Sequence, residues 1–197
     1  MTEGFLWAVF ILGGFLFGSV MFCSLLPKTI AHINLSEISD DGNPGAFNVF
    51  RHCGAKLGIP CLLLDLLKGF LPVFLAGLFT DRGSWLFAAV IVAPVLGHAI
   101  GMFNRFRGGK CIATAFGVTA GLIPATFVFF LLAALYILFS TIAKITPNRR
   151  RSIAVFTLFG VGAFLILIAG NQFPLAAGCA LISIVANIKH LIPSARG

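Results

Sequence analysis

Long apolar runs separated by short polar segments dominate the chain. An α-helix needs about 20 apolar residues to cross the hydrocarbon core of a bilayer, and five runs are of this order: residues 5–27, 57–79, 85–103, 152–170 and 173–191. A sixth run, 111–143, is too long for one helix and is interrupted by Gly121 and Pro124. Because proline breaks helices, this run is predicted to form two, over about 112–123 and 125–143. The pattern therefore predicts an all-α integral membrane protein with seven transmembrane helices.

Composition excludes a soluble protein. The 197 residues are 59% apolar and 10% charged, whereas a typical soluble domain is about 45–50% apolar and about 25% charged. The same apolar content excludes a disordered chain. The first apolar run follows Glu3 and is too long for a cleaved signal peptide, so we expect it to be retained as a span. We expect residues 1–197 to form a single membrane-embedded domain.

The distribution of lysine and arginine predicts the orientation, because cytoplasmic loops are enriched in both. The opposite side of the predicted membrane holds Arg82. The segments after the first, third and fifth spans, with the C-terminus, hold Lys28, Arg51, Lys56, Arg105, Arg107, Lys110, Lys144, Arg149, Arg150, Arg151, Lys189 and Arg196. This places the N-terminus outside and the C-terminus in the cytoplasm, provided that residues 111–143 cross twice.

The net charge of +8 at pH 7 indicates anionic partners. The positive residues lie in short blocks between apolar runs and form no stripe on a polar face. We therefore expect membrane lipid headgroups and phosphorylated substrates as partners, and no nucleic acid. The five cysteines are scattered through apolar segments without the spacing of a metal site or a disulfide, so we interpret them as small membrane hydrophobes.

Two polar segments have the character of phosphate-binding loops. The first is Asp40-Asp41-Gly42-Asn43-Pro44-Gly45-Ala46-Phe47-Asn48, followed by Arg51. Glycine and asparagine accept left-handed backbone, so the segment can wrap its N–H groups around an anion. The planar guanidinium of Arg51 suits phosphate. An ordinary turn-rich loop is the alternative interpretation.

The second segment is Arg105-Phe106-Arg107-Gly108-Gly109-Lys110, directly before the fourth predicted span. A Gly-Gly pair lets the backbone approach a ligand closely, and the following helix N-terminus offers free N–H groups and a positive dipole end. Arg107 and Lys110 add formal charge. The alternative is a positive-inside anchor, which explains the charges but not the glycines. The spacing is not that of a nucleotide P-loop.

Four ionisable or polar residues lie inside the predicted spans. Asp65 and Lys68 are three residues apart on one helix face and can neutralise each other as a buried pair. His98 lies near the cytoplasmic end of the third span, and Asn187 lies in the seventh. Each residue is a candidate for a functional site. The structural alternatives are a buried ion pair, an interior histidine and an interhelical hydrogen bond.

The order of these motifs resembles that of the bacterial acyl-phosphate:glycerol-3-phosphate acyltransferase family. The matching motifs are Gly18-Ser19, Gly42-Asn43-x-Gly45-Ala46-x-Asn48-x-x-Arg51-x-x-Gly54, Asp65-x-x-Lys68-Gly69-x-x-Pro72, Gly97-His98 and Arg107-Gly108-Gly109-Lys110-x-x-Ala113-Thr114. The resemblance is clearest over residues 10–125. It implies a multi-pass enzyme of the bacterial inner membrane with seven spans and an external N-terminus.

The resemblance also implies a reaction and a set of site residues. The family moves a fatty acyl group from acyl phosphate to the 1-hydroxyl of glycerol 3-phosphate, giving lysophosphatidic acid for phospholipid synthesis, without acyl-CoA, metal or other cofactor. The first loop would bind glycerol 3-phosphate and the Gly-Gly-Lys loop would bind acyl phosphate. The implied catalytic residues are Lys110, Arg51 and Asp41, and the implied substrate-binding residues are Gly42, Asn43, Gly45, Asn48, Lys68, His98, Arg107, Gly108, Gly109, Thr114 and Asn187.

The chain departs from the family pattern at several positions. Asp41 replaces a substrate-binding serine, and a carboxylate beside a phosphate dianion repels it. Phe47 replaces a threonine, Cys111 replaces a glycine, and Ile184 stands where a His-Arg-Glu sequence begins before Asn187 in the family. Two alternatives therefore stay open. One is an acyl-phosphate-dependent transferase with a different acceptor, and the other is a non-catalytic relative or a transporter of the same fold.

Overall fold

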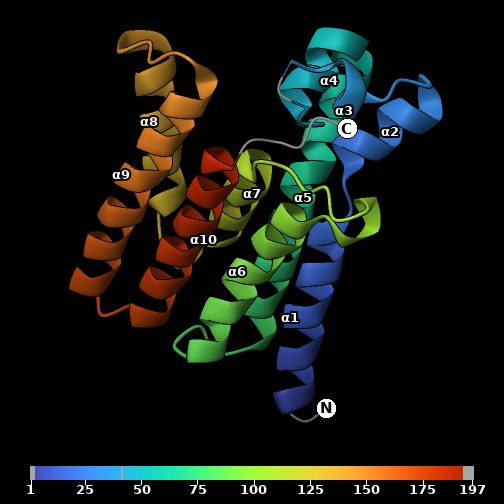
Figure 1. Cartoon of the computed structure of the whole chain (residues 1–197). Helices are drawn as coiled ribbons and strands as arrows, with labels where there is room; N and C mark the ends of the chain where they lie inside the picture. Colours follow the sequence, from blue (N-terminus) through green and yellow to red (C-terminus); the bar gives the residue numbers. More distant parts are fainter. Residues whose placement is uncertain (1–2, 41, 193–197) are drawn as a thin grey trace.

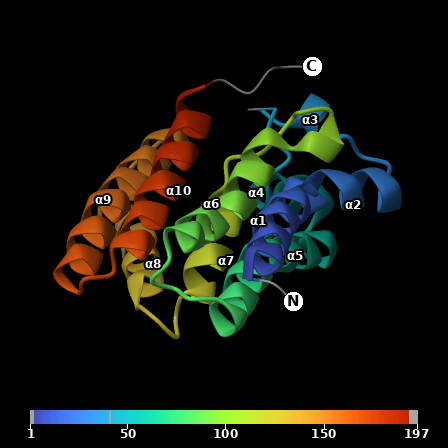
Figure 2. The ribbon, with the colours of Figure 1, turned by 90° about the horizontal axis from the view of Figure 1, so that it is seen from below.

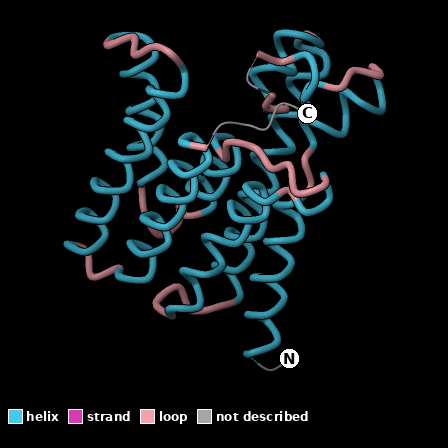
Figure 3. The backbone as a smooth tube through the Cα atoms, in the orientation of Figure 1, coloured by secondary structure: helices cyan, strands magenta, loops and turns pink. Residues whose placement is uncertain are grey.

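The computed structural model of the chain describes residues 3–40 and 42–192, and every regular element in these residues is helical (Figures 1 and 3). A 3-10 turn, η1 (Met102–Asn104), follows α6, and a π-helical turn, η2 (Leu138–Ile142), follows α8. The α-helices are α1 (Glu3–Ser19), α2 (Phe22–Ile30), α3 (Leu35–Ile38), α4 (Ala46–Cys53), α5 (Ala55–Phe79), α6 (Trp85–Ile100), α7 (Ile112–Gly121), α8 (Val128–Ile137), α9 (Asn148–Ala169) and α10 (Phe173–Leu191).

Among the described residues, four helical segments are long and apolar enough to cross a membrane, and a fifth candidate is the bent pair of α1 and α2. The four are α5, α6 together with η1 (Trp85–Asn104), α9 and α10, and they coincide closely with the predicted spans at 57–79, 85–103, 152–170 and 173–191. The all-α prediction is confirmed for the described residues, and the number of crossings and their orientation stay predictions.

The apolar run at 111–143 divides where Gly121 and Pro124 predict a break. Helix α7 ends at Gly121 and α8 begins at Val128, and Figure 1 shows the chain turning back between them. The 10 residues of α7 make a helix about 15 Å long, roughly half the thickness of the hydrocarbon core. Helix α7 is therefore too short to cross a bilayer by itself.

The first predicted span, 5–27, is wrong at its end. Helix α1 stops at Ser19, the axis bends by 43° into α2, and Pro27 lies inside α2 instead of closing the span. The bend frees the carbonyl of Val20, which accepts a hydrogen bond from Nζ of Lys68 at 2.5 Å. Because Lys68 on α5 supplies this partner, the backbone can break inside an apolar environment.

The helices outside the segment of α2, α3 and α4 form two rows, which Figure 2 shows end-on. One row contains α9, α10, α6 and α1, and the other contains α8, α7 and α5. Neighbours within a row pack on each other, and α1, α6 and α9 also pack across the rows on α5, α7 and α8. This arrangement holds the start of α7 between α5 and α6.

Glycines bring the helix backbones close where the helices cross. A Cβ atom at Gly97 of α6 would lie 2.1 Å from the Phe15 carbonyl oxygen on α1, and one at Gly117 of α7 would lie 2.0 Å from the Leu66 carbonyl oxygen on α5. Neither position has room for a side chain. Close backbone approach at small residues is a main source of helix association in membranes.

The predicted cytoplasmic segments gather at one end of the helix rows. Nε and Nη2 of Arg149, at the start of α9, donate to the carbonyls of His190 and Leu191 at the end of α10, at 2.6 and 2.7 Å. The segment containing α2, α3 and α4 lies toward the same end, and the start of α1 lies at the opposite end (Figure 1).

Candidate active site

The first predicted loop enters α4 through a backbone that its own side chains hold. Gly42 has a φ of 61°, a left-handed conformation that glycine adopts without strain. The Asn48 amide, which is buried, donates from Nδ2 to the Asn43 carbonyl oxygen at 2.7 Å. Asn48 therefore positions the loop from within α4. Asp41 lies outside the described residues.

Arg51 is exposed on α4. Its Nη1 pairs with Oδ2 of Asp40 at 2.5 Å, with both side chains more than half exposed. Such exposed ion pairs contribute about 0–1 kcal/mol to the stability of the fold, so Arg51 can leave Asp40 at little cost in free energy. Arg51 does not line the cationic cavity or the apolar groove that are described below. Its assignment as a catalytic residue stays a prediction.

The Gly-Gly-Lys loop lies directly on the end of α6. The N–H of Gly109 donates to the His98 carbonyl at 3.0 Å. A Cβ atom would lie 2.0 Å from the Ala99 carbonyl oxygen at Gly108, and 2.3 Å from Nε2 of His98 at Gly109. The glycines were expected to let a ligand approach the backbone. The structure gives a further reason for them, since any side chain would lift the loop off α6.

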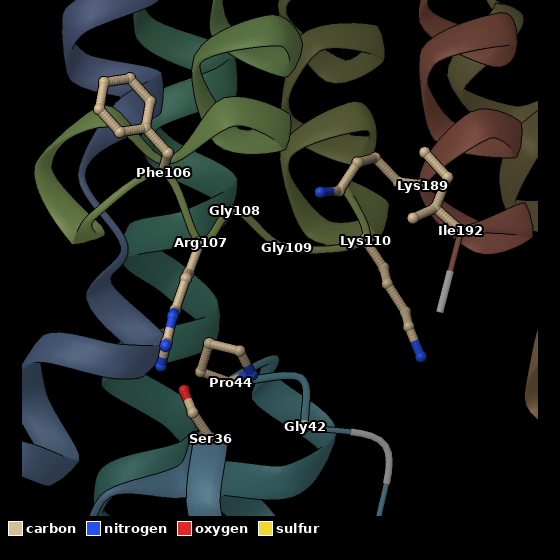
Figure 4. Close-up of a pocket in the computed structure, with 10 residues that line it drawn as sticks. All are labelled: Ser36, Gly42, Pro44, Phe106, Arg107, Gly108, Gly109, Lys110, Lys189 and Ile192. Atoms are coloured by element: carbon tan, nitrogen blue, oxygen red, sulfur yellow. The ribbon is translucent and has the colours of Figure 1, made fainter. Parts of the chain in front are cut away.

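A cavity of about 210 Å³ lies between this loop, the segment before α4 and the end of α10 (Figure 4). We call it the cationic cavity, because Arg107, Lys110 and Lys189 line it and none of the described lining residues is acidic. In Figure 4, Arg107 and Lys110 extend from the loop in the same general direction, toward the side of Gly42 and Pro44. Three positive side chains around a small cavity favour a phosphate group.

A second cavity of about 540 Å³ lies beside the first, between α4, α5 and α7. We call it the apolar groove, since its walls are mostly hydrophobic: Ala46, Phe47, Phe50, Leu62, Leu66, Ile112, Ala113, Phe116 and Phe129. Its polar lining includes His98, Asp65 and Lys110. Lys110 therefore borders both cavities.

The first loop also separates the two cavities. Gly42 and Pro44 line the cationic cavity, and Asn43 and Gly45 line the apolar groove. A polar molecule in one cavity and an apolar chain in the other would thus meet at Lys110 and this loop. That geometry suits a reaction that joins a soluble polar substrate to an apolar chain.

The remaining predicted residues have different environments. The buried ion pair predicted for Asp65 and Lys68 is confirmed, with Nζ and Oδ1 2.8 Å apart and Lys68 fully buried. Thr114 is buried on α7, and among the described residues its Oγ1 has no hydrogen-bond partner. Asn187 donates from Nδ2 to Oγ1 of Thr157 on α9 at 3.2 Å, an interhelical bond away from both cavities. Substrate binding by Lys68, Thr114 and Asn187 stays a prediction.

Sequence reasoning missed two polar residues of the cationic cavity. Lys189 was counted only as a positive-inside charge, and Ser36 was not singled out, yet both line the cavity. Lys189 lies two residues after Asn187, in the last turn of α10. That placement, at the same end as the Gly-Gly-Lys loop, was the available signal.

The chain was compared with known proteins. A family model described as glycerol-3-phosphate acyltransferase matches residues 8–194. The chain belongs to this family. The glycerol-3-phosphate acyltransferase of Hydrogenobaculum sp. (strain Y04AAS1) is 36% identical over 191 residues, which cover 95% of this chain and 89% of that protein. The glycerol-3-phosphate acyltransferase of Geotalea daltonii is 35% identical over 182 residues, which cover 92% and 89%.

Solved structures agree with this membership. The crystal structure of PlsY (YgiH), an integral membrane glycerol 3-phosphate acyltransferase, matches in its glycerol 3-phosphate form with a TM-score of 0.78 and 29% identity, covering 94% of this chain and 88% of that chain. Its lysophosphatidic acid form matches with a TM-score of 0.73 and 28% identity. The family resemblance read from the motifs is confirmed, and this family member is an integral membrane acyltransferase.

Proposed function

We propose that this acyltransferase moves a fatty acyl group from acyl phosphate to the 1-hydroxyl of glycerol 3-phosphate and releases lysophosphatidic acid and inorganic phosphate. The observation that carries the proposal is the position of Lys110 on the border between the cationic cavity and the apolar groove. Drug-sized ligands occupy pockets of about 300–1,000 Å³. The cationic cavity is smaller than this range and suits a small phosphate ester, and the groove lies within it.

Each part of the site has a role in this proposal. The phosphate of glycerol 3-phosphate binds to Arg107 and Lys189 in the cationic cavity, and the acyl chain lies in the groove against Phe116 and its apolar neighbours. Lys110 holds the phosphate of the acyl donor where the two substrates meet. Holding both substrates in contact makes the reaction effectively unimolecular, which is a large part of catalysis.

The proposed chemistry is an acyl transfer to an oxygen atom. The 1-hydroxyl oxygen attacks the acyl carbon, the bond between that carbon and the phosphate oxygen breaks, and the hydroxyl proton passes to a phosphate oxygen. Negative charge develops on the carbonyl oxygen and on the leaving phosphate. The ammonium of Lys110, at the border of the groove, stabilises this charge, and such preorganised electrostatic contacts are commonly the largest catalytic term.

The proposed placement is in the bacterial inner membrane with seven crossings, of which the fourth is made by the short helix α7 together with the turn that follows it, and with an external N-terminus and a cytoplasmic C-terminus. Helices α7 and α8 return the chain between α6 and α9, so the basic segments share one side. The cationic cavity then opens toward the cytoplasm, where glycerol 3-phosphate is available. The excess of lysine and arginine at this end supports that orientation.

The activity is tested by measuring phosphate release from acyl phosphate by the purified protein, with and without glycerol 3-phosphate. We expect release that depends on glycerol 3-phosphate and falls by about 10²–10³-fold in Lys110→Ala. Arg150→Ala is the matched control, because Arg150 is an exposed cation on α9 outside both cavities. Unchanged turnover in Lys110→Ala overturns the site. Phosphate release that requires a different polyol in place of glycerol 3-phosphate would show that the enzyme uses a different acceptor.

The orientation is tested by cysteine labelling from either side of the membrane. Single cysteines at Ser84 and Arg150 are introduced in a Cys53→Ser background, because the other four native cysteines are buried. The cysteine at position 150 should be labelled only from the cytoplasm and that at position 84 only from outside. Labelling of both from one face would overturn the double crossing of residues 111–143.

A further inference from the structure

A third cavity lies next to the cationic cavity but outside the site described above. It has a volume of about 290 Å³ and lies between the bend that joins α1 to α2 and the loop after α6. We call it the perimeter cavity. Lys28, Arg105 and Arg107 line it, and none of its described lining residues is acidic. Arg107 and Ser36 also line the cationic cavity, so these two residues form a shared wall.

Hydrogen bonds hold the wall of the perimeter cavity in place. Oγ of Ser24 on α2 donates to Oδ1 of Asn104 at 3.4 Å, and Nδ2 of Asn104 donates to the Arg107 carbonyl at 2.8 Å. Asn104 therefore ties the loop to α2 across the cavity. The carboxylate of Glu37 accepts a bond from the Asn34 amide at 2.5 Å and partly offsets the positive charge. The three cations leave the cavity positive.

The apolar part of the lining distinguishes this cavity from a site that binds a free ion. Leu25 and Phe103 line it while remaining 48% and 61% exposed. Exposed apolar side chains next to a cationic cavity match a ligand with a charged head and an apolar body. Basic residues at the cytoplasmic surface of membrane proteins attract anionic lipids in this way. Inorganic phosphate would leave Leu25 and Phe103 uncovered.

We propose that the perimeter cavity binds the phosphate headgroup of an anionic membrane lipid, with the lipid chains along Leu25 and Phe103. The site is separate from the two cavities of the active site and lies on the other side of Arg107. A lipid phosphate bound there competes for the Arg107 guanidinium and repels a second phosphate across the shared wall. On the proposed function, the bound lipid therefore raises KM for glycerol 3-phosphate and leaves kcat unchanged.

Binding is measured first, independently of activity. The purified protein in detergent is titrated with dioleoyl phosphatidic acid, and bound lipid is counted by native mass spectrometry. We compare Lys28→Gln/Arg105→Gln with Lys144→Gln/Arg150→Gln, which removes the same charge from exposed positions outside the cavity. At about fivefold per cation near a membrane surface, the first variant should lose about 30-fold in affinity and the second should bind as wild type.

Three results would overturn the site. Equal losses in the two double variants would show a general effect of charge, and unchanged binding in Lys28→Gln/Arg105→Gln would show that the lipid lies elsewhere. Displacement of the lipid by inorganic phosphate at equal concentration would identify a free-phosphate site instead.

Kinetics in phosphatidylcholine nanodiscs, with and without phosphatidic acid, test the consequence. The lipid should raise KM in the wild type and not in Lys28→Gln/Arg105→Gln. Loss of this KM effect with lipid binding intact would refute the competition across Arg107. Absence of any glycerol 3-phosphate-dependent turnover in the wild type would refute the proposed function and leave the binding result standing.

Discussion

Breaking the buried ion pair of Lys68 and Asp65 should lower the stability of the protein by a large amount. Lys68 is fully buried, lies 2.8 Å from the Asp65 carboxylate, and donates to the Val20 carbonyl that the bend between α1 and α2 leaves free. Its Nζ also lies 5.7 Å from the centre of the Phe22 ring. Lys68→Met removes all of these contacts without reducing the apolar bulk of the side chain. The Val20 carbonyl then loses the Lys68 donor, and the buried Asp65 carboxylate loses its counter-ion and retains the hydrogen bond from Sγ of Cys23 at 3.1 Å.

The size of the effect follows from these contacts. Removing one member of a buried ion pair costs about 3–5 kcal/mol, and leaving a buried carbonyl unsatisfied costs about 1–3 kcal/mol. In Asp65→Leu/Lys68→Met the unpaired charge is absent, so only the carbonyl cost remains and about 3–5 kcal/mol is recovered. Each kcal/mol of change in the free energy of unfolding moves Tm by about 2–4 °C for a chain of this length. The double variant should therefore melt about 6–20 °C above Lys68→Met.

A thiol-reactive fluorescent dye measures Tm in detergent, because Cys23, Cys61, Cys111 and Cys179 are buried and react when the chain unfolds. Lys56→Met is the control, since Lys56 is exposed in the first turn of α5. The double variant should also keep the wild-type KM for glycerol 3-phosphate. A double variant no more stable than Lys68→Met would refute the ion-pair argument. A raised KM in a stable double variant would instead support a role in substrate binding for Lys68 or for Asp65, which lines the apolar groove.

Three further predictions concern the active site. Gly109→Ala places a Cβ atom 2.3 Å from Nε2 of His98, so the loop must move. Because small misplacements of catalytic groups lower the rate by up to about 10²-fold, kcat should fall at least about tenfold. Gly83→Ala, on the loop before α6, is the control. Lys189→Gln should raise KM for glycerol 3-phosphate by about tenfold with little change in kcat, as a charged hydrogen bond contributes about 1.5–3 kcal/mol; an unchanged KM would remove Lys189 from the site. Asp41→Ser restores the family's hydroxyl, and we expect it to reduce turnover on the native acceptor by about 10²–10⁴-fold if Asp41 is a base. Identical kinetics on a panel of polyol phosphates would exclude Asp41 from the site.

Helix positions could be read from the sequence because membrane burial leaves a long apolar signal. The helices α5, α9 and α10 match their predicted spans within a few residues. The bend after Ser19 could not be read in the same way. Residues 20–27 remain mostly apolar through the bend, and the donor that satisfies Val20 comes from Lys68, 48 residues later. An apolar run indicates that a segment is buried. It does not indicate where a side chain distant in sequence supplies the hydrogen bond that a bend in the helix requires.

The site was predictable to the extent that it lies within continuous motifs. The segments 42–45 and 107–110 were each identified, and the structure brings them together around Lys110. Lys189 was missed because it lies 79 residues after Lys110 in the sequence. Its position beside the Gly-Gly-Lys loop is set by helix packing and not by any local pattern.

Helix α10 shows why a weak motif match can still leave a positive charge at the site. The His-Arg-Glu that precedes Asn187 in the family is absent here, yet the same end of α10 still presents Lys189 to the cationic cavity. A phosphate site requires positive charge at a place in the fold and not at a particular sequence position, since Coulomb attraction depends on the distance between the charges and on the local dielectric. Loss of a motif on α10 therefore does not by itself imply loss of phosphate binding, and the kinetics of Lys189→Gln decide whether this lysine supplies that charge.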